Sequence, residues 1–141
     1  MNSADGLMVA DKTFTCTVLT PERRVLETAA TFAAVPAFDG EVGIMHDRAP
    51  LLCRLGVGIL RLDTPQGAQR IFVDAGFAEM LDNKLTVLTE QAAFAKDVDV
   101  EAERAAEAAA RSRHAKTPEE QAARQHEMTR AATKLKLAAG S

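Results

Sequence analysis

The sequence predicts an α+β protein in which an N-terminal antiparallel β-sandwich is followed by a C-terminal antiparallel hairpin of two helices. All six phenylalanines lie at or before Phe94, and seven of the eight glycines lie at or before Gly76. Ala, Glu, Arg, Lys and Gln, which favour helices, make up most of the chain from Asp97 to Leu137. Before that point, β-branched and aromatic runs alternate with Gly and Pro, as is typical of strands and turns. We therefore expect a flexible N-terminal segment at 1–12, a β-sandwich domain at 13–95 and a helical hairpin at 96–141.

Short strands separated by turns are expected in the first half. From Thr13 to Val18 polar and apolar residues alternate, which is the period of a half-buried strand. Further strands are expected at Arg24–Glu27, Ala30–Val35, Val57–Leu62, Arg70–Val73, Ala78–Leu81 and Lys84–Glu90. Turns are expected at Pro21–Arg24, at Pro36, at Thr64–Gly67 and at Asp82-Asn83. Strands at spacings of roughly 8–12 residues, with antiparallel neighbours, indicate a sandwich or a barrel.

The segment Gly40–Leu52 lies between two of these runs. Its two glycines, three residues apart, suggest a tight backbone excursion, and the charged stretch His46-Asp47-Arg48 should project from the surface. Taken alone, the segment predicts an ordinary surface loop between strands.

The helical half contains consistent boundary signals. Asp97 or Asp99 can cap a first helix, whose first turn is acidic and whose last turn is basic, as the helix dipole favours. Thr117-Pro118-Glu119-Glu120 then begins a second helix with a capping box and with Pro at the first position. We expect each helix to be about 25–30 Å long, at 1.5 Å per residue.

Alanine dominates the helix faces that are expected to meet. The expected contact residues are Ala102, Ala105, Ala106, Ala109 and Ala110 on the first helix, and Met128, Ala131, Ala132, Leu135 and Ala138 on the second. Each buried methyl contributes under about 1 kcal/mol, so the hairpin should be held only weakly against the sandwich. A detachable hairpin and a permanently docked one both remain open.

Composition and charge exclude several classes of protein. The net charge is −3 and neither half carries the basic excess expected of a nucleic-acid-binding protein. No apolar run approaches the roughly 20 residues that span a bilayer. Residues 1–12 resemble neither a secretory signal nor a transit peptide, and whether Met1 or Met8 is the true start is not decided. Cys16 and Cys53 lie in apolar strand-like runs, which favours buried free thiols over a disulfide.

No pattern in the chain predicts an active site or a metal site. Phosphate-binding and dinucleotide-binding glycine motifs are missing, as is the ligand spacing of an EF-hand. His46, His114 and His126 do not have metal-ligand spacing, and no serine or cysteine has a plausible base nearby in sequence. We expect a protein without an active site of its own.

Four motifs, in order along the chain, resemble the epsilon subunit of bacterial F-type ATP synthases. Gly40–Leu52 resembles the family signature Gly-Glu-x-Gly-Ile-x-Pro-Gly-His-Ala-Pro-Leu-Leu, and Val18–Glu22 resembles the opening strand and turn. Gly76–Met80 is similar to Gly-Gly-Phe-x-Glu-Val, and Leu85–Glu90 to Val-Thr-Val-Leu-Ala-Asp. Asp97-Val98-Asp99 followed by an Ala/Glu/Arg helix matches the start of the family's hairpin.

This resemblance implies a non-catalytic central-stalk (rotor) subunit that links the gamma subunit to the c-ring and couples proton flow to ATP synthesis. It would be a peripheral membrane protein on the cytoplasmic face of the bacterial inner membrane. Its hairpin would fold against the sandwich or extend into the catalytic alpha/beta head and inhibit ATP hydrolysis. Whether the hairpin inhibits here, what triggers it and which ion drives the rotor stay open.

The resemblance also assigns candidate residues. Glu41 is retained and Arg48 takes the place of the signature histidine, so both are candidates for the c-ring or gamma contact. Some relatives bind ATP through Ile/Leu-Asp-x-x-Arg-Ala at the first helix. Here Asp99 is kept and Ala102 replaces the arginine, so we expect weak or absent ATP binding and no cofactor. The degenerate nucleotide site would comprise Asp99, Arg130 and Lys134, and the inhibitory contacts with the acidic catalytic head Arg124, Arg130, Lys134 and Lys136.

Two other readings remain. One is an unrelated β-sandwich binding module whose helices mediate homo-oligomerisation through the alanine faces. The other is a standalone nucleotide sensor with the same fold, which the alanine at position 102 disfavours.

Overall fold

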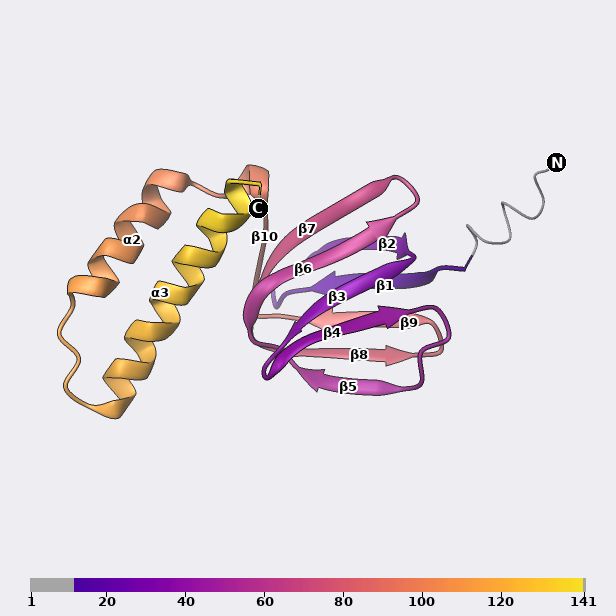
Figure 1. Ribbon diagram of the computed structural model, residues 1–141, viewed down its shortest axis with the longest axis horizontal. Helices are drawn as coiled ribbons and strands as arrows, with labels where there is room; N and C mark the ends of the chain where they lie inside the picture. The colour runs from indigo at the N-terminus through magenta and orange to yellow at the C-terminus, as the bar shows by residue number, and fades with distance from the viewer. Residues whose placement is uncertain (1–11, 141) are drawn as a thin grey trace.

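The computed structural model describes residues 12–140 and contains a β-sandwich of two five-stranded sheets followed by two helices that pack together (Figure 1). The fold class expected from the sequence is confirmed. Residues 1–11, which are most of the segment expected to be flexible, lie outside the described part of the chain.

Each sheet takes its strands from distant parts of the first 94 residues. Sheet A has the spatial order β2 (Arg24–Ala30), β1 (Phe14–Leu19), β9 (Lys84–Leu88), β8 (Phe77–Leu81), β5 (Leu51–Arg54). Sheet B has the order β10 (Gln91–Phe94), β7 (Gly67–Asp74), β6 (Val57–Thr64), β3 (Phe32–Ala37), β4 (Gly40–Met45). Neighbouring strands are antiparallel except β1 and β9, which run parallel. The expectation of antiparallel neighbours therefore fails for this pair.

The core lies between the two sheets and follows the alternation of the strands. Phe14, Cys16 and Val18 of β1 are buried, while Thr15 and Thr17 point away from the core. Leu60 and Leu62 of β6 enter the same core from sheet B. Both cysteines are free thiols, and burial raises the pKa of Cys16 to about 12, so this thiol stays protonated.

Two departures from the expected strands occur around β3 and β4. The expected loop Gly40–Leu52 is instead mostly strand: Gly40–Met45 forms β4, the edge strand of sheet B, and only the next five residues turn the chain toward β5. Pro36 does not end its strand, because β3 continues to Ala37. Proline is tolerated there because the pairing of β3 with β6 stops at Ala34, so its missing N–H removes no bond of that ladder.

The hairpin that joins β8 to β9 follows the expectation. Asp82 and Asn83 both have positive φ, at 51° and 61°, which is the conformation of a type I′ turn. The expected strand Lys84–Glu90 is shorter, because Thr89 and Glu90 cross from sheet A to sheet B before the unpredicted strand β10.

A 3-10 turn, η1 (Ala95–Asp97), leads into helices α2 (Val100–Ser112) and α3 (Pro118–Ala138). Of the two candidate caps, Asp99 is used, and its Oδ1 accepts a hydrogen bond from the Ala102 N–H at 3.1 Å. The capping box of Thr117 and Glu120 is present as expected. With 13 and 21 residues, the helices are about 20 and 30 Å long, so the first is shorter than expected.

The prediction that alanines form the contact face of the first helix is wrong. Ala110 is buried, but Ala102, Ala105, Ala106 and Ala109 are exposed. The less exposed side of α2 is instead formed by Val100, Glu103, Glu107 and Ala110. Because alanine gains little from burial, the longer stems of the glutamates, and the pairing of Glu103 with Lys134 of α3, decide which side of α2 faces inward. On α3, Ala131 is buried, Met128, Leu135 and Ala138 are half-buried and Ala132 is exposed.

We predict that Gly76→Ala destabilises the sandwich far more than Gly67→Ala. Both glycines have positive φ, but a Cβ at position 76 would lie 1.9 Å from the Leu88 carbonyl oxygen, whereas one at position 67 meets nothing within 4 Å. We expect losses of about 3 and 1 kcal/mol in the free energy of unfolding, respectively. Urea unfolding of both variants measures this, and equal losses would show that the contact with Leu88 is unimportant.

A second prediction concerns the tip of the helical hairpin in acid. Hydrogen bonds from the backbone N–H groups of Lys116 and Thr117 lower the pKa of Glu120. The hydrogen bond from Arg113 lowers the pKa of Glu127, which lies on α3. A carboxylate whose folded pKa is depressed stabilises the folded state above its unfolded pKa, and loses that contribution as pH falls through the folded pKa. We therefore expect the protection of amides at the tip, relative to their intrinsic exchange rate at each pH, to fall below the ordinary glutamate pKa of about 4.3. In Glu120→Gln this acid step should shrink, whereas Glu119→Gln should retain it.

Candidate functional site

The helical hairpin binds the sandwich through α3, which lies between α2 and sheet B (Figure 1). Four consecutive residues of β7, from Ile71 to Asp74, are buried. Alternation explains this pattern, because Ile71 and Val73 enter the sandwich core while Phe72 and Asp74 lie on the outer face of the sheet, under α3. The docked helix therefore covers one aromatic ring and one carboxylate at the end of β7.

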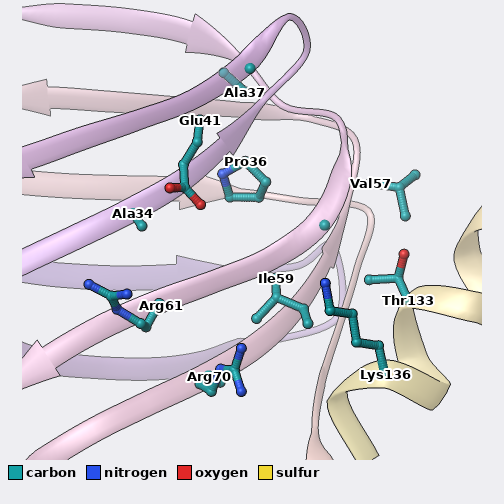
Figure 2. Close-up of a pocket in the computed structure, with 12 residues that line it drawn as sticks. Ala34, Pro36, Ala37, Glu41, Val57, Ile59, Arg61, Arg70, Thr133 and Lys136 are labelled. Carbon is teal, nitrogen blue, oxygen red and sulfur yellow. The ribbon is translucent and has the colours of Figure 1, made fainter. Parts of the chain in front are cut away.

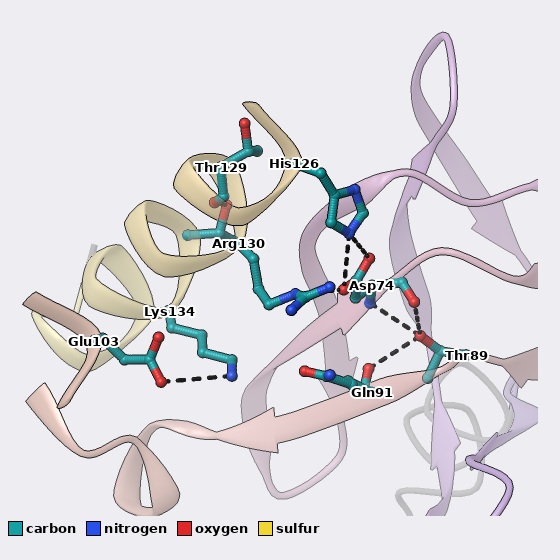
Figure 3. Close-up of polar contacts among 9 residues, drawn as sticks. Asp74, Thr89, Gln91, Glu103, His126, Thr129, Arg130 and Lys134 are labelled. Carbon is teal, nitrogen blue, oxygen red and sulfur yellow. Dashed lines mark hydrogen bonds and ion pairs between the residues drawn. The ribbon is translucent and has the colours of Figure 1, made fainter. Parts of the chain in front are cut away.

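Asp74, His126 and Arg130 form the principal polar contact, which we call the Asp74 cluster (Figure 3). The Asp74 side chain is only 2% exposed, and its Oδ2 accepts a hydrogen bond from Arg130 Nε at 2.8 Å. His126 Nε2 lies 3.2 Å from Oδ2. It is also 3.1 Å from Oδ1, but not in hydrogen-bond geometry, so Oδ1 has no hydrogen-bond partner among the described residues. A carboxylate this buried needs a charged partner, and α3 provides it.

Thr89 holds the backbone of Asp74 in place. Its Oγ1 accepts a hydrogen bond from the Asp74 N–H at 2.9 Å, and its hydroxyl lies 3.0 Å from the carbonyl oxygens of Asp74 and Gln91. The threonine thus ties the end of β7 to the start of β10, which orients the carboxylate toward α3 (Figure 3).

Lys134, one turn further along α3, joins the two helices and the sheet. Its Nζ lies 3.5 Å from Glu103 Oε2 on α2, and 5.1 Å from the centre of the Phe72 ring. The side chains of Lys134 and Glu103 are each only 18% exposed, so this ion pair is better shielded from solvent than those on the surface.

The residues expected to form a degenerate nucleotide site therefore have intramolecular partners in the docked hairpin. Asp99 caps α2, Arg130 pairs with Asp74, and Lys134 pairs with Glu103. The other two basic residues expected to contact the catalytic head form no ion pair with a carboxylate of the described chain. Arg124 donates to the Arg113 carbonyl oxygen at 3.2 Å, near the tip of the helices, and Lys136 lines a cavity beside sheet B.

Glu41 and Arg48 do not come together in the structure. Glu41 lies at the start of β4 and lines the same cavity as Lys136, whereas Arg48 lies in the turn after β4 (Figure 1). The strand between Glu41 and Met45 alone spans about 13 Å. The turn that carries Arg48 is tied to the β8–β9 hairpin, because Asn83 Oδ1 accepts from the Asp47 N–H at 2.7 Å.

Sheet A exposes an apolar surface on its outer face, which we call the sheet A patch and define as Leu19, Leu52, Phe77 and Leu88. Leu52, Phe77 and Leu88 are 68%, 51% and 51% exposed. Two shallow hollows adjoin at Phe77 and Leu88, one extending to Leu52 and the other to Leu19. Large apolar side chains gathered on an otherwise uncovered sheet indicate a surface that binds another protein.

Neither Asp74 nor the sheet A patch was expected from the sequence. For Asp74, a signal exists: a carboxylate directly follows the apolar run Ile71-Phe72-Val73, where a charge needs a partner. For the patch, alternation in β8 and β9 places apolar residues on both faces, and one face must then remain exposed or be covered by a partner.

Within residues 12–140, no group of three or more His, Cys, Asp or Glu side chains is arranged to hold a metal ion. The described helices include none that is both long and apolar enough to cross a membrane.

Comparison with known proteins gives one consistent family. Residues 13–95 match the family model of the ATP synthase delta/epsilon chain, beta-sandwich domain. The ATP synthase epsilon chain of Rhodopirellula baltica is 52% identical over 77 residues, which are 55% of this chain and 60% of that one. The ATP synthase epsilon chain of Pelotomaculum thermopropionicum is 36% identical over 108 residues, which cover 77% of this chain and 81% of that one.

Solved structures show the same fold at low sequence identity. A chain of the Euglena gracilis mitochondrial ATP synthase superposes with a TM-score of 0.77 and 17% identity, over 86% of this chain and 79% of that one. A chain of the Tetrahymena thermophila mitochondrial ATP synthase central stalk and c-ring gives 0.66 and 14%, over 88% and 95%. The matched sandwich, the relatives and the two-part architecture together show that this chain belongs to the ATP synthase epsilon chain family, a non-catalytic subunit.

Proposed function

We propose that the chain is a central-stalk (rotor) subunit of a proton-translocating F-type ATP synthase, which links the gamma subunit to the c-ring. It would couple proton flow to ATP synthesis on the cytoplasmic face of a bacterial inner membrane. Family membership supports this role, as does the likeness in fold to a chain of a central stalk and c-ring. The observation that carries the proposal is the sheet A patch.

The patch fits a permanent protein partner. Leu52, Phe77 and Leu88 expose large apolar side chains in one place, on the sheet that α3 leaves uncovered. Exposed apolar area of this kind is stabilised when a partner excludes water from it, by about 25 cal/mol for each Å². We assign the patch to the gamma subunit, the partner that would hold this subunit on the stalk.

The c-ring contact is assigned to one end of the sandwich. Arg48 lies in the β4–β5 turn, next to the 61% exposed Met45, at the end remote from the helices (Figure 1). A charged and an apolar side chain on a firmly tied turn suit contact with polar loops. Glu41, at the other end of β4, would belong to a separate contact.

The hairpin would act as a reversible inhibitor of ATP hydrolysis. In the docked arrangement Arg130 is held by Asp74 of the sandwich, so release would free Arg130, together with Lys136, for an acidic surface of the catalytic alpha/beta head. Lys134 and Arg124 have their partners within the hairpin, so they would become available when the two helices also separate. Nucleotide sensing would be weak, because Asp99 serves as a helix cap and Ala102 supplies no cation.

We predict that Phe77→Ser and Leu88→Ser each weaken binding to purified gamma subunit by roughly tenfold or more, as expected at an apolar centre of an interface. Met45→Ser is the matched control, since this side chain is equally exposed but lies on sheet B. The measurement is the dissociation constant from calorimetry. Unchanged affinity in both patch variants, or recovery of only self-associated protein from solubilised membranes, would rule out this assignment.

We predict that Asp74→Asn releases α3 from the sandwich. Loss of a charged hydrogen bond corresponds to about 1.5–3 kcal/mol, so amide exchange in α3 should accelerate by roughly tenfold or more. Arg111→Gln, which loses only a surface pair with Glu107, serves as control. The docking role of Asp74 is refuted by unchanged exchange in Asp74→Asn.

The same variant tests inhibition in the assembled enzyme. If the released hairpin inhibits, Asp74→Asn should lower the rate of ATP hydrolysis, and the further changes Arg124→Gln and Lys136→Gln should restore it. Faster exchange in α3 with an unchanged hydrolysis rate would mean that the hairpin detaches without inhibiting.

A further inference from the structure

A cavity of about 420 Å³ lies beside α3, against the outer face of sheet B (Figure 2). Three basic side chains line it: Arg61 from β6, Arg70 from β7 and Lys136 from α3. We call this the cationic pocket. It lies on a different flank of α3 from Lys134, which faces Phe72 and Glu103.

The positive charge of the pocket is poorly balanced. Arg61 and Arg70 are directly opposite each other in the β6–β7 ladder, an arrangement that disfavours like charges. Arg61 has a carboxylate partner in Asp63, at 3.5 Å, and both side chains are about half exposed. Over residues 12–140, Arg70 and Lys136 take part in no ion pair, and Glu41, the acidic residue of the lining, pairs with no cation.

The walls of the pocket are rigid. Arg61 and Arg70 stand on paired strands, with Ile59 between them and α3. Gly58 packs so closely on Pro36 that a Cβ there would lie 2.5 Å from the proline Cβ, which fixes the spacing of β3 and β6 beneath the pocket. Side chains on rigid elements are suited to hold a ligand in one place.

We propose that the cationic pocket binds a phosphate-class anion, such as inorganic phosphate, pyrophosphate or the phosphate group of a larger molecule. Arginine presents a planar set of donors that matches phosphate oxygens in pairs, and lysine adds a point charge. An anion at this place also removes the repulsion among three neighbouring cations. The residues involved are separate from Asp99, Arg130 and Lys134, which already have partners.

A bound anion would couple to the hairpin, because Lys136 comes from α3 and the two arginines come from the sheet. A ligand that contacts both parts stabilises the docked arrangement by mass action. The pocket does not require the stalk role proposed above, so either can be refuted without the other.

The test is a titration of the isolated full-length chain with sodium phosphate and with sodium pyrophosphate, followed by amide chemical shifts at constant ionic strength set with chloride. We expect saturable shifts at Gly58, Ile59, Arg70 and Lys136, and slower amide exchange in α3. Arg70→Gln and Lys136→Gln should each raise the dissociation constant by roughly tenfold, the effect of losing one charged hydrogen bond. Arg104→Gln and Lys84→Gln, which remove exposed cations elsewhere, are the matched controls.

A second arm separates a soluble anion from a lipid headgroup. Flotation with vesicles of phosphatidylglycerol and phosphatidylcholine, compared with phosphatidylcholine alone, detects a lipid phosphate, and binding lost in Arg70→Gln would assign the pocket to that source. Saturation by the soluble salts assigns it to a free anion. The proposal is overturned if neither arm shows binding, or if binding is unchanged in Arg70→Gln and Lys136→Gln.

Discussion

The buried carboxylate of Asp74 is the constraint on which the arrangement of the helices depends. A charge that is 2% exposed is strongly unfavourable unless a cation neutralises it, and Arg130 of α3 is the cation within hydrogen-bond distance. Because Arg130 and His126 keep 31% and 40% of their side-chain surface in solvent, the contact is weaker than a fully buried ion pair. The hairpin is thus held by specific polar contacts together with the burial of Phe72. Such contacts are compatible with two conformations that differ by a few kcal/mol.

The two sheets of the sandwich differ in what covers them. The outer face of sheet B is screened by α3, and Phe72 is completely buried as a result. The outer face of sheet A carries Leu52, Phe77 and Leu88 with nothing from the described chain upon them. Release of the hairpin would leave the patch unchanged, since the two surfaces lie on opposite sides of one core. A partner bound to sheet A can therefore stay in place while α3 docks on sheet B or is released from it.

The sequence was sufficient for the fold class and for most strands, because period-two alternation and turn residues such as Asp82-Asn83 depend on local structure. It was insufficient where contacts with a distant part of the chain determine the local structure or the buried face. The segment after Gly40 reads as a loop, and only pairing with β3 makes it β4. The alanines of α2 lie on all sides of the helix, so their positions could not identify the face that packs inward. That face is determined by Glu103 and its partner Lys134. The candidate residues Arg130 and Lys134 were predicted, but their docked partners, Asp74 and Glu103, were not.

The two flanks of α3 differ in electrostatic balance, and this difference bears on how docking is controlled. On one flank Arg130 and Lys134 meet carboxylates and an aromatic ring, so their approach to the sandwich is favourable. On the other, Lys136 approaches Arg61 and Arg70, so docking brings like charges closer together. The favourable flank is built from fixed side chains, whereas the unfavourable one can be altered by whatever anion the solution supplies. The stability of the docked hairpin should therefore depend both on its contacts with Asp74 and Phe72 and on how far the charge of the second flank is neutralised.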